Sequence, residues 1–549
     1  MKRSVHDESV LTAEKIGEAA RTDPQLRVPL RPRVRRGLVF DFEEGQVAVE
    51  GGPKRQLLRG RAATDILPRL LELLDGHRDH EQLAEALQLP IPKVFKVLAL
   101  LWTCGVIEEG PPETPLTSPV DPSLADFLSR ISDSTGVNLR WEDAIGRLSA
   151  AKVEVFGEGP AAESVRRELG ASLEVELGKG SLPRADTTFV LQVDSGEDFQ
   201  QLTETCWKQG LPLLRFRIMG RTALLGPLVV PGTTACLHCQ TTEDVLDQRT
   251  PAQEDIGLAA ALMSRDLFAM LSRSTPTPLP MRWRMLDMET LEQEQLSATT
   301  RPGCGMCSIA DGPMEERAPL AARFESSIAF PPKEFADPKA HQAHYKPSNI
   351  ALQLTEKAWP SAPTVELPVP VPERLAKNVT EHTNGQLPSE PVSADDLALL
   401  LLIMVGPQHV APNHLWRWTA SGGNIGSAVA YLVVRDVTGI TPGIYGYVSS
   451  GNRLARLSSV PDAIPGTAPL SVVLTGDFTT VARKYSTFAL RIVLLDSGCV
   501  QAAAKQTALA LGISFALQPR WDDMAVARAL NIDPDTEPVT AVIDFGGDR

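Results

Sequence analysis

The sequence predicts a multidomain protein that combines α/β and α+β units. Its 549 residues are enough for about three or four domains, and 43% of them are apolar. Strand patterns precede helix patterns near the N-terminus, whereas strands and helices alternate further along the chain. Proline-rich stretches at 110–122 and 313–392 separate the patterned regions. We therefore expect domains at 28–110, 123–312 and 393–549, with 313–392 as a connector.

The first domain is predicted to be a winged helix. Between residues 34 and 59, apolar and polar residues alternate and turn residues interrupt the pattern twice, which indicates a three-stranded meander. Apolar residues then recur at helical spacing in three segments. These segments are 63–74, 80–87 and 92–105. Three strands followed by three helices are typical of a winged-helix domain.

The second domain is predicted to contain a largely parallel, Rossmann-like sheet. Its strands are expected at 152–156, 172–177, 187–193 and 211–218, with a helix at 198–209. Gly157-x-Gly159-x-x-Ala162 follows the first strand, where glycines let a backbone approach a phosphate. No acidic residue for a ribose ends the next strand. A structural turn is therefore favoured over a nucleotide site, and both interpretations stay open.

Four of the seven cysteines form two Cys-x-x-Cys pairs, Cys236 with Cys239 and Cys304 with Cys307. Two pairs of this spacing supply four thiolates for a tetrahedral zinc ion. Two disulfides or four unrelated core thiols are the alternatives. A zinc ion with four protein ligands has no open position for a substrate, so we expect this site to be structural.

The third domain is predicted to alternate apolar helices with strands. The helices are expected at 394–405 and 500–511. The strands are expected at 428–434, 443–448, 470–474 and 491–495. The connector before it is rich in proline, alanine and charge, and we expect it to contain some helix.

The charge and the apolar runs restrict the partners and the compartment. The formal net charge of −14 argues against a general nucleic-acid binder, although residues 31–36 form a short basic run. The first residues are polar and do not resemble a signal peptide. The longest apolar run, 397–405, is far short of the roughly 20 residues that span a bilayer. We therefore expect no membrane association and a cytoplasmic location.

Residues 226–239 read Gly-Pro-Leu-Val-Val-Pro-Gly-Thr-Thr-Ala-Cys-Leu-His-Cys. They resemble the zinc segment of the ThiF/ubiquitin-activating-like proteins found in thiazole/oxazole-modified peptide clusters. Cys304 and Cys307 match the pair that closes that domain. The resemblance covers 123–312 and implies a Rossmann-like, ThiF-type domain. Members with a degenerate nucleotide loop do not adenylate; they bind the leader of a precursor peptide and present it to a separate YcaO-type cyclodehydratase.

The N-terminal domain is similar to the peptide-recognition element of the same family. Such a domain binds an extended leader as an added strand beside its third strand, against its third helix. The resemblance implies Leu57, Val94 and Leu98 as candidates to line the leader pockets. Because winged helices often bind DNA, DNA binding is the alternative. The predicted third helix is too apolar for a DNA groove, which favours a peptide.

The third domain carries motifs in a further recognisable order. They are Ser421-Gly-Gly423, Tyr431–Val434, Pro442–Tyr447, Arg483-Lys-Tyr485 and Arg491. In this order they resemble the nitroreductase-like flavin dehydrogenases of the streptolysin-S type, which oxidise azolines to azoles. The resemblance implies a nitroreductase-like flavin fold and a homodimer that shares its flavin sites.

The same resemblance implies the site residues. Lys484 and Tyr485 match the family's catalytic pair, with Tyr485 as a base whose pKa Lys484 lowers. The positions implied for FMN binding are Ser421, Gly422, Gly423 and Arg491. The chain departs from the family before this domain, where Arg374, Lys377 and His382 replace an arginine-rich phosphate-binding stretch. It also departs around Cys499, where Ala502 and Ala503 follow instead of a Gln-Asn pair.

Together these resemblances predict a fused maturation protein for a ribosomal peptide. It would bind a precursor leader, work with a YcaO-type cyclodehydratase and oxidise azolines to azoles with FMN. One alternative is a leader-binding scaffold whose flavin domain has degenerated. The other is a flavoenzyme that acts on another peptide group.

Overall fold

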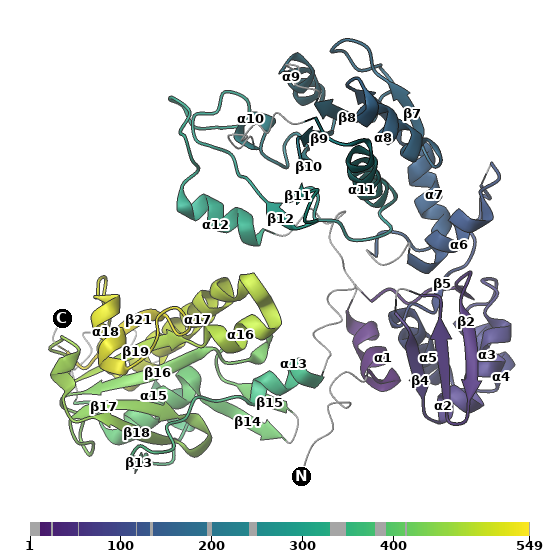
Figure 1. Cartoon of the computed structure of the whole chain (residues 1–549). Coiled ribbons are helices and arrows are strands. Elements are labelled where there is room, and N and C mark those ends of the chain that lie inside the picture. The colour runs from purple at the N-terminus through teal and green to yellow at the C-terminus, as the bar shows by residue number, and fades with distance from the viewer. Residues whose placement is uncertain are drawn as a thin grey trace. The chain divides into compact units, whose positions relative to one another are not determined.

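The computed structural model divides the chain into two compact units, Leu11–Gln342 and Ala343–Arg549 (Figure 1). The structure describes residues 11–23, 26–52, 54–116, 118–131, 136–194, 200–240, 250–329, 347–378, 391–411 and 414–547. The side chain of Lys377 and the whole of His382 lie outside this description. The architecture is mixed α/β, with several separate sheets.

The N-terminal part of the first unit contains the expected meander followed by helices. The strands β2 (Val39–Glu43), β3 (Gln46–Glu50) and β4 (Gln56–Arg59) form an antiparallel sheet in the order β2-β3-β4. The predicted helix at 63–74 is divided into α2 (Arg61–Asp65) and α3 (Leu67–Leu73). Pro68 explains this break, because proline has no N–H and clashes with the carbonyl four residues earlier.

Two more helices, and a helix outside the predicted domain, complete this part. The helices α4 (His80–Leu87) and α5 (Ile91–Thr103) are separated by a short turn, as expected. An N-terminal helix, α1 (Ala13–Thr22), packs against α5. Gly17 makes this close approach possible, since a Cβ there would lie 2.5 Å from Cγ of Lys96. The face of α5 that carries Lys96 is therefore covered by the chain itself.

A buried charge network joins these elements to the helices that follow. The short strands β1 (Pro32–Val34) and β5 (Ile107–Glu109) pair with each other, and Arg33 on β1 contacts two carboxylates. Its guanidinium donates to Glu108 at 3.0 Å and to Glu142 at 2.5 and 2.9 Å. Burial raises the pKa of Glu108 to about 7, although Arg33 and Arg35 oppose this. Glu142 lies on α7 (Trp141–Ala150), so the network fastens α7 to β1 and β5.

The second sheet has seven strands in the order β12-β11-β10-β9-β8-β6-β7. The strands β7 (Glu174–Leu177), β6 (Lys152–Phe156), β8 (Phe189–Asp194) and β9 (Leu213–Met219) are parallel. The remaining strands, β10 (Thr222–Val229), β11 (Trp283–Asp287) and β12 (Gln293–Leu296), are antiparallel to their neighbours. The prediction of a largely parallel sheet holds for only half of it, because a tight turn at Gly220 (φ +56°) reverses the chain after β9.

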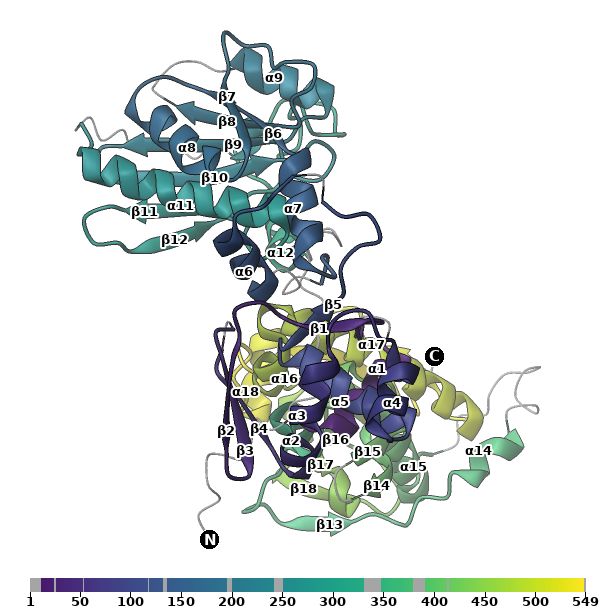
Figure 2. The same cartoon turned by 90° about the vertical axis from the view of Figure 1, so that its right-hand side faces the viewer.

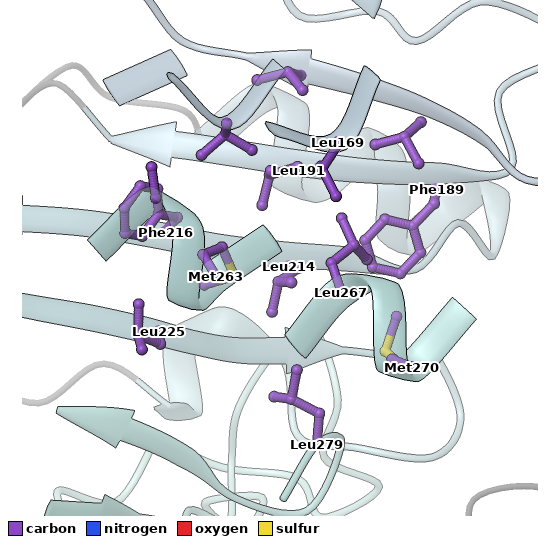
Figure 3. Packing of buried hydrophobic residues seen from close by; sticks show 14 of the residues in the cluster. Leu169, Phe189, Leu191, Leu214, Phe216, Leu225, Met263, Leu267, Met270 and Leu279 are labelled. Atoms are coloured by element: carbon purple, nitrogen blue, oxygen red, sulfur yellow. The ribbon is translucent and has the colours of Figure 1, made fainter. Parts of the chain in front are cut away.

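Helices cover both faces of this sheet (Figure 2). On one face, α7, α8 (Pro160–Gly170) and α11 (Gln253–Ser272) enclose the larger hydrophobic core. Figure 3 shows Met263, Leu267 and Met270 of α11 packed over the leucine and phenylalanine side chains of the strands. On the other face, α9 (Gln200–Gln209) covers Phe156, Val190 and Leu213 through Leu202 and Cys206.

The C-terminal unit is built on an antiparallel sheet in the order β13-β18-β17-β16-β19-β21-β20. The strands are β13 (Thr364–Glu366), β16 (Ala428–Val434), β17 (Gly443–Val448), β18 (Arg453–Ser458), β19 (Leu470–Gly476), β20 (Phe515–Leu517) and β21 (Val539–Phe545). The helices α15 (Ala394–Val405) and α17 (Ala489–Leu511) cover one face, and α18 (Asp523–Leu530) covers the other. The first strand, β13, lies within the segment that we expected to be a connector.

The predicted strand at 491–495 is wrong, since these residues lie in α17. Val493 is buried, whereas Leu494 and Leu495 are exposed, which is the burial pattern of a helix and not of a strand. Among the described residues, one helical stretch, Phe478–Leu511, is long and apolar enough to cross a membrane. Val493, Val500 and Ala504 of this stretch lie in the hydrophobic cores of the C-terminal unit.

Candidate functional site

The four predicted metal ligands converge in the first unit. Cys236 directly precedes the short helix α10 (Leu237–Gln240), and Cys239 lies within it. Cys304 and Cys307 lie on a later turn. The Sγ atoms are 3.5 Å apart for Cys236 and Cys304 and for Cys239 and Cys307, and all four lie within 4.8 Å of one another. A zinc ion 2.3 Å from four sulfurs separates them by about 3.8 Å, so the cluster can hold a metal ion such as zinc.

The alternatives to a metal site fit this geometry less well. All four cysteines are free, and a 3.5 Å separation is too long for a disulfide bond of about 2.05 Å. Burial raises the pKa of Cys239 to about 11. Against the raising effect of burial, the backbone N–H groups of Met306 and Cys307 lower the pKa of Cys304 to about 7. A metal ion that binds this cluster has to displace the protons of these thiols.

Arg301 supports the cysteine cluster, and sequence reasoning missed it. Its backbone N–H donates to Sγ of Cys239 at 3.3 Å, as second-shell donors do around metal-bound thiolates. Its guanidinium donates to the carbonyls of His238 and Glu316 and so ties the two cysteine turns together. Gly303 has φ +75°, and a Cβ there would lie 2.2 Å from the carbonyl oxygen of Pro313. Only glycine therefore permits the second turn to close.

In the C-terminal unit, Lys484 and Tyr485 end the helix α16 (Phe478–Tyr485). Both side chains are half-buried and reach the backbone of Gly423. A Cβ on Gly423 would lie 2.6 Å from Nζ of Lys484 and 2.6 Å from Oη of Tyr485. The Lys484 Nζ also lies 5.4 Å from the centre of the Tyr485 ring. The structure therefore brings the predicted catalytic pair and the predicted glycine loop together.

Asp496 holds this loop, and sequence reasoning missed it too. Its carboxylate accepts hydrogen bonds from Oγ of Ser421 at 2.8 Å, from the N–H of Gly422 at 2.7 Å and from Oγ of Ser427 at 2.6 Å. Asp496 is 4% exposed, and a buried carboxylate needs such donors. The incorrect prediction of a strand at 491–495 is why Asp496 was missed. In the structure Asp496 lies in α17 and faces the loop.

The electrostatics of the pair differ from the expectation. Burial, together with the charge of Asp496, raises the pKa of Tyr485, so Lys484 does not lower it. Burial lowers the pKa of Lys484. Among the residues that the structure describes, no carboxylate lies within ion-pair distance of Lys484. Burial therefore shifts both side chains towards their neutral forms, the amine of Lys484 and the phenol of Tyr485.

The other residues that the resemblance implies for FMN binding differ in what they contact. A Cβ on Gly422 would lie 2.5 Å from Cγ2 of Ile492, so the loop packs closely on α17. The guanidinium of Arg491 lies 5.9 Å from the ring centre of Phe488. Arg374, a candidate phosphate ligand, donates to Asp396 at 2.8 Å. A phosphate at Arg374 therefore has to compete with a carboxylate.

The residues predicted to contact a leader peptide or a nucleotide lie in the first unit. Leu57 is 45% exposed on β4, which has no second strand neighbour among the described residues. Val94 and Leu98 are buried in the core, and their role in lining a peptide pocket stays a prediction. Gly157 (φ +138°) lies so close to β8 that a Cβ would be 2.3 Å from the carbonyl oxygen of Val193. Close packing alone thus accounts for this glycine.

No protein-family model matches the chain, and no curated protein matches it. Among solved structures, the heterocyclase TruD is 17% identical with a TM-score of 0.39, covering 51% of this chain and 43% of that chain. Escherichia coli MccB is 13% identical with a TM-score of 0.39, covering 51% of this chain and 97% of that one. A putative nitroreductase from Ralstonia eutropha is 16% identical with a TM-score of 0.28, covering 35% and 92%. The chain thus spans less than half of the heterocyclase that it matches.

We predict that the protein contains one zinc ion for each chain and that Cys236→Ser and Cys304→Ser each abolish its binding. Removal of one thiolate leaves an incomplete tetrahedral site. Metal content measured by plasma mass spectrometry tests this, and a chelator should lower the melting temperature of the wild type. Cys499→Ser, which changes an exposed cysteine, is the matched control and should keep the metal. Metal-free wild-type protein that folds normally would contradict the prediction.

Proposed function

We propose that this chain is a ribosomal-peptide maturation protein that binds a precursor leader and oxidises azolines to azoles with FMN. In this proposal a separate YcaO-type cyclodehydratase forms the azolines. The convergence of Lys484 and Tyr485 on Gly423 carries the oxidase part, because it groups an amine, a phenol and a half-buried glycine backbone at one point. The edge strand β4 carries the leader-binding part.

Oxidation of an azoline to an azole removes a hydride and a proton from adjacent ring carbons. Bound FMN supplies the two-electron acceptor for the hydride. A nearby base has to accept the proton, and Lys484 suits this role because its burial favours the neutral amine. Tyr485, whose pKa is raised, suits the role of a hydrogen-bond donor to the ring. This assignment exchanges the roles that the sequence suggested for the two residues.

The residues around Gly423 fit the polar edge of a flavin ring. Protein groups that tune a flavin are hydrogen-bond donors and charges placed near its ring nitrogens. Ser421, Gly422 and Gly423 belong to a loop that Asp496 holds through three hydrogen bonds, and Tyr485 adds a hydroxyl donor beside it. Arg491, on the first turn of α17, is the remaining candidate for the phosphate.

The leader proposal rests on the free edge of β4. An extended peptide can add a strand there, with its backbone supplying affinity and Leu57 contacting one of its side chains. DNA binding is disfavoured because α1 covers the Lys96 face of α5, which a recognition helix would expose. The cysteine centre, with four protein ligands, would remain structural in this scheme.

The homodimer proposal rests on the outer face of α17. Leu494 and Leu495 are 51% and 59% exposed, and Cys499 and Ala502 continue this face along the helix. Apolar residues that gather on one exposed helix face mark an interaction surface. A second copy that covers this face would lie beside Arg491 and would complete a site open on one side.

A leader-binding scaffold with a degenerate flavin domain is the second candidate. The ion pair of Arg374 with Asp396 favours it, since that cation is then not available to a phosphate. A flavoenzyme acting on another peptide group would use the same Lys484 and Tyr485. A test of flavin binding distinguishes the scaffold from the two enzymes. The identity of the substrate then distinguishes the two enzymes from each other.

We predict that the purified protein binds FMN, shows flavin absorption and oxidises a thiazoline peptide from its cognate precursor. The rate should rise with pH as Lys484 loses its proton, with a midpoint below the ordinary 10.5 because burial lowers its pKa. Lys484→Arg should lower kcat by about a hundredfold, since arginine stays protonated, and should leave FMN bound. Mass spectrometry detects the loss of two hydrogens.

The control for this experiment is Lys208→Arg, which changes an exposed lysine on α9 and should match the wild type. A colourless protein that takes up no added FMN would overturn the oxidase proposal and favour the scaffold. A flavoprotein that leaves every azoline unchanged would favour the other flavoenzyme.

We predict that a fluorescent leader peptide binds the protein and that Leu57→Glu weakens this binding about tenfold, because a charge replaces an apolar contact. Fluorescence polarisation measures the Kd. Val39→Glu is the matched control, since Val39 is 64% exposed on β2, the opposite edge strand. Equal losses in both variants would show that β4 is not the binding edge.

We predict that the protein is a dimer in solution and that Leu495→Glu converts it to a monomer, because a buried charge opposes the interface. Light scattering gives the mass. Leu320→Glu is the control, as Leu320 is 77% exposed on α12 (Leu320–Ile328) in the other unit. A wild-type monomer would contradict the dimer proposal without affecting the leader proposal.

A further inference from the structure

The segment 347–366, which we term the strap, precedes α15 and packs on the C-terminal unit. It contains α13 (Pro347–Ala351), a turn of 3-10 helix (Leu352–Leu354) and the strand β13. Lys357 forms an ion pair with Glu537, and that carboxylate also accepts from Oη of Tyr431 at 2.9 Å. Trp359 stacks edge-on against Tyr431 with 5.4 Å between ring centres. The strap is therefore a packed part of this unit.

One residue of the strap, Gln353, reaches the loop that carries Gly423. Its side-chain Nε2 donates to the carbonyl of Gly423 at 3.5 Å, and its Oε1 accepts from Nδ2 of Asn424 at 3.3 Å. The amide thus contacts the two residues on either side of one peptide bond. Neighbouring Leu352 lies in the same hydrophobic cluster as Val481 of α16, against which Tyr485 packs.

Arg417 fastens the backbone of Gln353 to the same loop. Its Nη2 donates to the carbonyl of Gln353 at 3.1 Å and to that of Ile425 at 2.9 Å, and its Nε donates to that of Asn424 at 3.4 Å. Gly426 allows this, because a Cβ there would lie 2.2 Å from Cζ of Arg417. One guanidinium therefore gathers carbonyls from the strap and from the loop.

Asp496 holds the loop from the opposite direction. It binds Ser421, Gly422 and Ser427, the two ends of the loop, whereas Gln353 contacts its middle. Without the Gln353 amide, the carbonyl of Gly423 and the side chain of Asn424 each lose a hydrogen bond to the strap. The tips of Lys484 and Tyr485 lie against the Cα of Gly423, so a shift of this backbone changes the surface that they contact.

We propose that Gln353 is a positioning residue of the Lys484–Tyr485 site. It acts by holding the Gly423 backbone against the two side chains, and it contacts neither substrate nor cofactor itself. The proposal rests on the proposed oxidase function. A displacement of a catalytic group by about 1 Å can cost up to about a hundredfold in rate, which makes a contact of this kind consequential.

The test compares Gln353→Met with the wild type. Methionine has nearly the same length and keeps the apolar packing but removes both hydrogen bonds of the amide. We expect kcat to fall by about tenfold or more with KM changed less than about twofold, because positioning affects the reaction and not substrate binding. Gln518→Met is the matched control: Gln518 is half-buried and hydrogen-bonded to Asp544, near the other end of β19.

A second readout is independent of flavin and azoline. Acylation of Lys484, followed by peptide mass spectrometry across a pH series, gives the midpoint at which the amine loses its proton. In Gln353→Met this midpoint should move up towards 10.5, since a loosened loop admits water to the amine. Gln518→Met should leave it unchanged.

Unchanged kcat together with an unchanged Lys484 midpoint in Gln353→Met would overturn the proposal. If that variant does not fold, as judged by circular dichroism, Gln353→Glu decides, because it keeps the length and the acceptor for Asn424 but loses the donor to Gly423. Wild-type protein that oxidises no azoline would refute the proposed function alone. The shift of the Lys484 midpoint would then still support or refute the positioning role.

Discussion

The buried carboxylate of Asp496 is the constraint on which the C-terminal unit depends. A carboxylate that is 4% exposed is tolerated only when donors surround it, and here all three come from one loop. The same helix, α17, supplies Val500 and Ala504 to the core and Leu494 to the surface. Core, loop and outer face are therefore linked through a single helix, and a rotation of that helix would disturb all three.

The pattern of apolar residues alone predicted the bounds of several strands and helices correctly. The bounds of β6, β16, β17 and α15 agree with their predicted ranges, because each is a bounded apolar run of ordinary length. The prediction of a strand at 491–495 failed because four consecutive apolar residues after Arg491 fit either a strand or a stretch of helix. The antiparallel half of the large sheet begins with the reversal at Gly220 between β9 and β10, which periodicity does not reveal.

The two candidate sites differ in how far the sequence could predict them. The cysteine spacing is local information, so it predicted the cluster, whereas Arg301 reaches the cluster from outside both motifs. Ser421 and Asp496 are 75 residues apart, and Gln353 and Gly423 are 70 apart, so no local pattern connects them. The directions of the pKa shifts of Lys484 and Tyr485 follow from burial, which is a property of the folded chain.

The charge network of Arg33, Glu108 and Glu142 has a mechanical consequence. Hinging α7 away from β1 and β5 would leave Glu142 without its cation, while Glu108 would keep Arg33, and an uncompensated buried charge costs several kcal/mol. The network therefore resists movement of α7 away from β1 and β5.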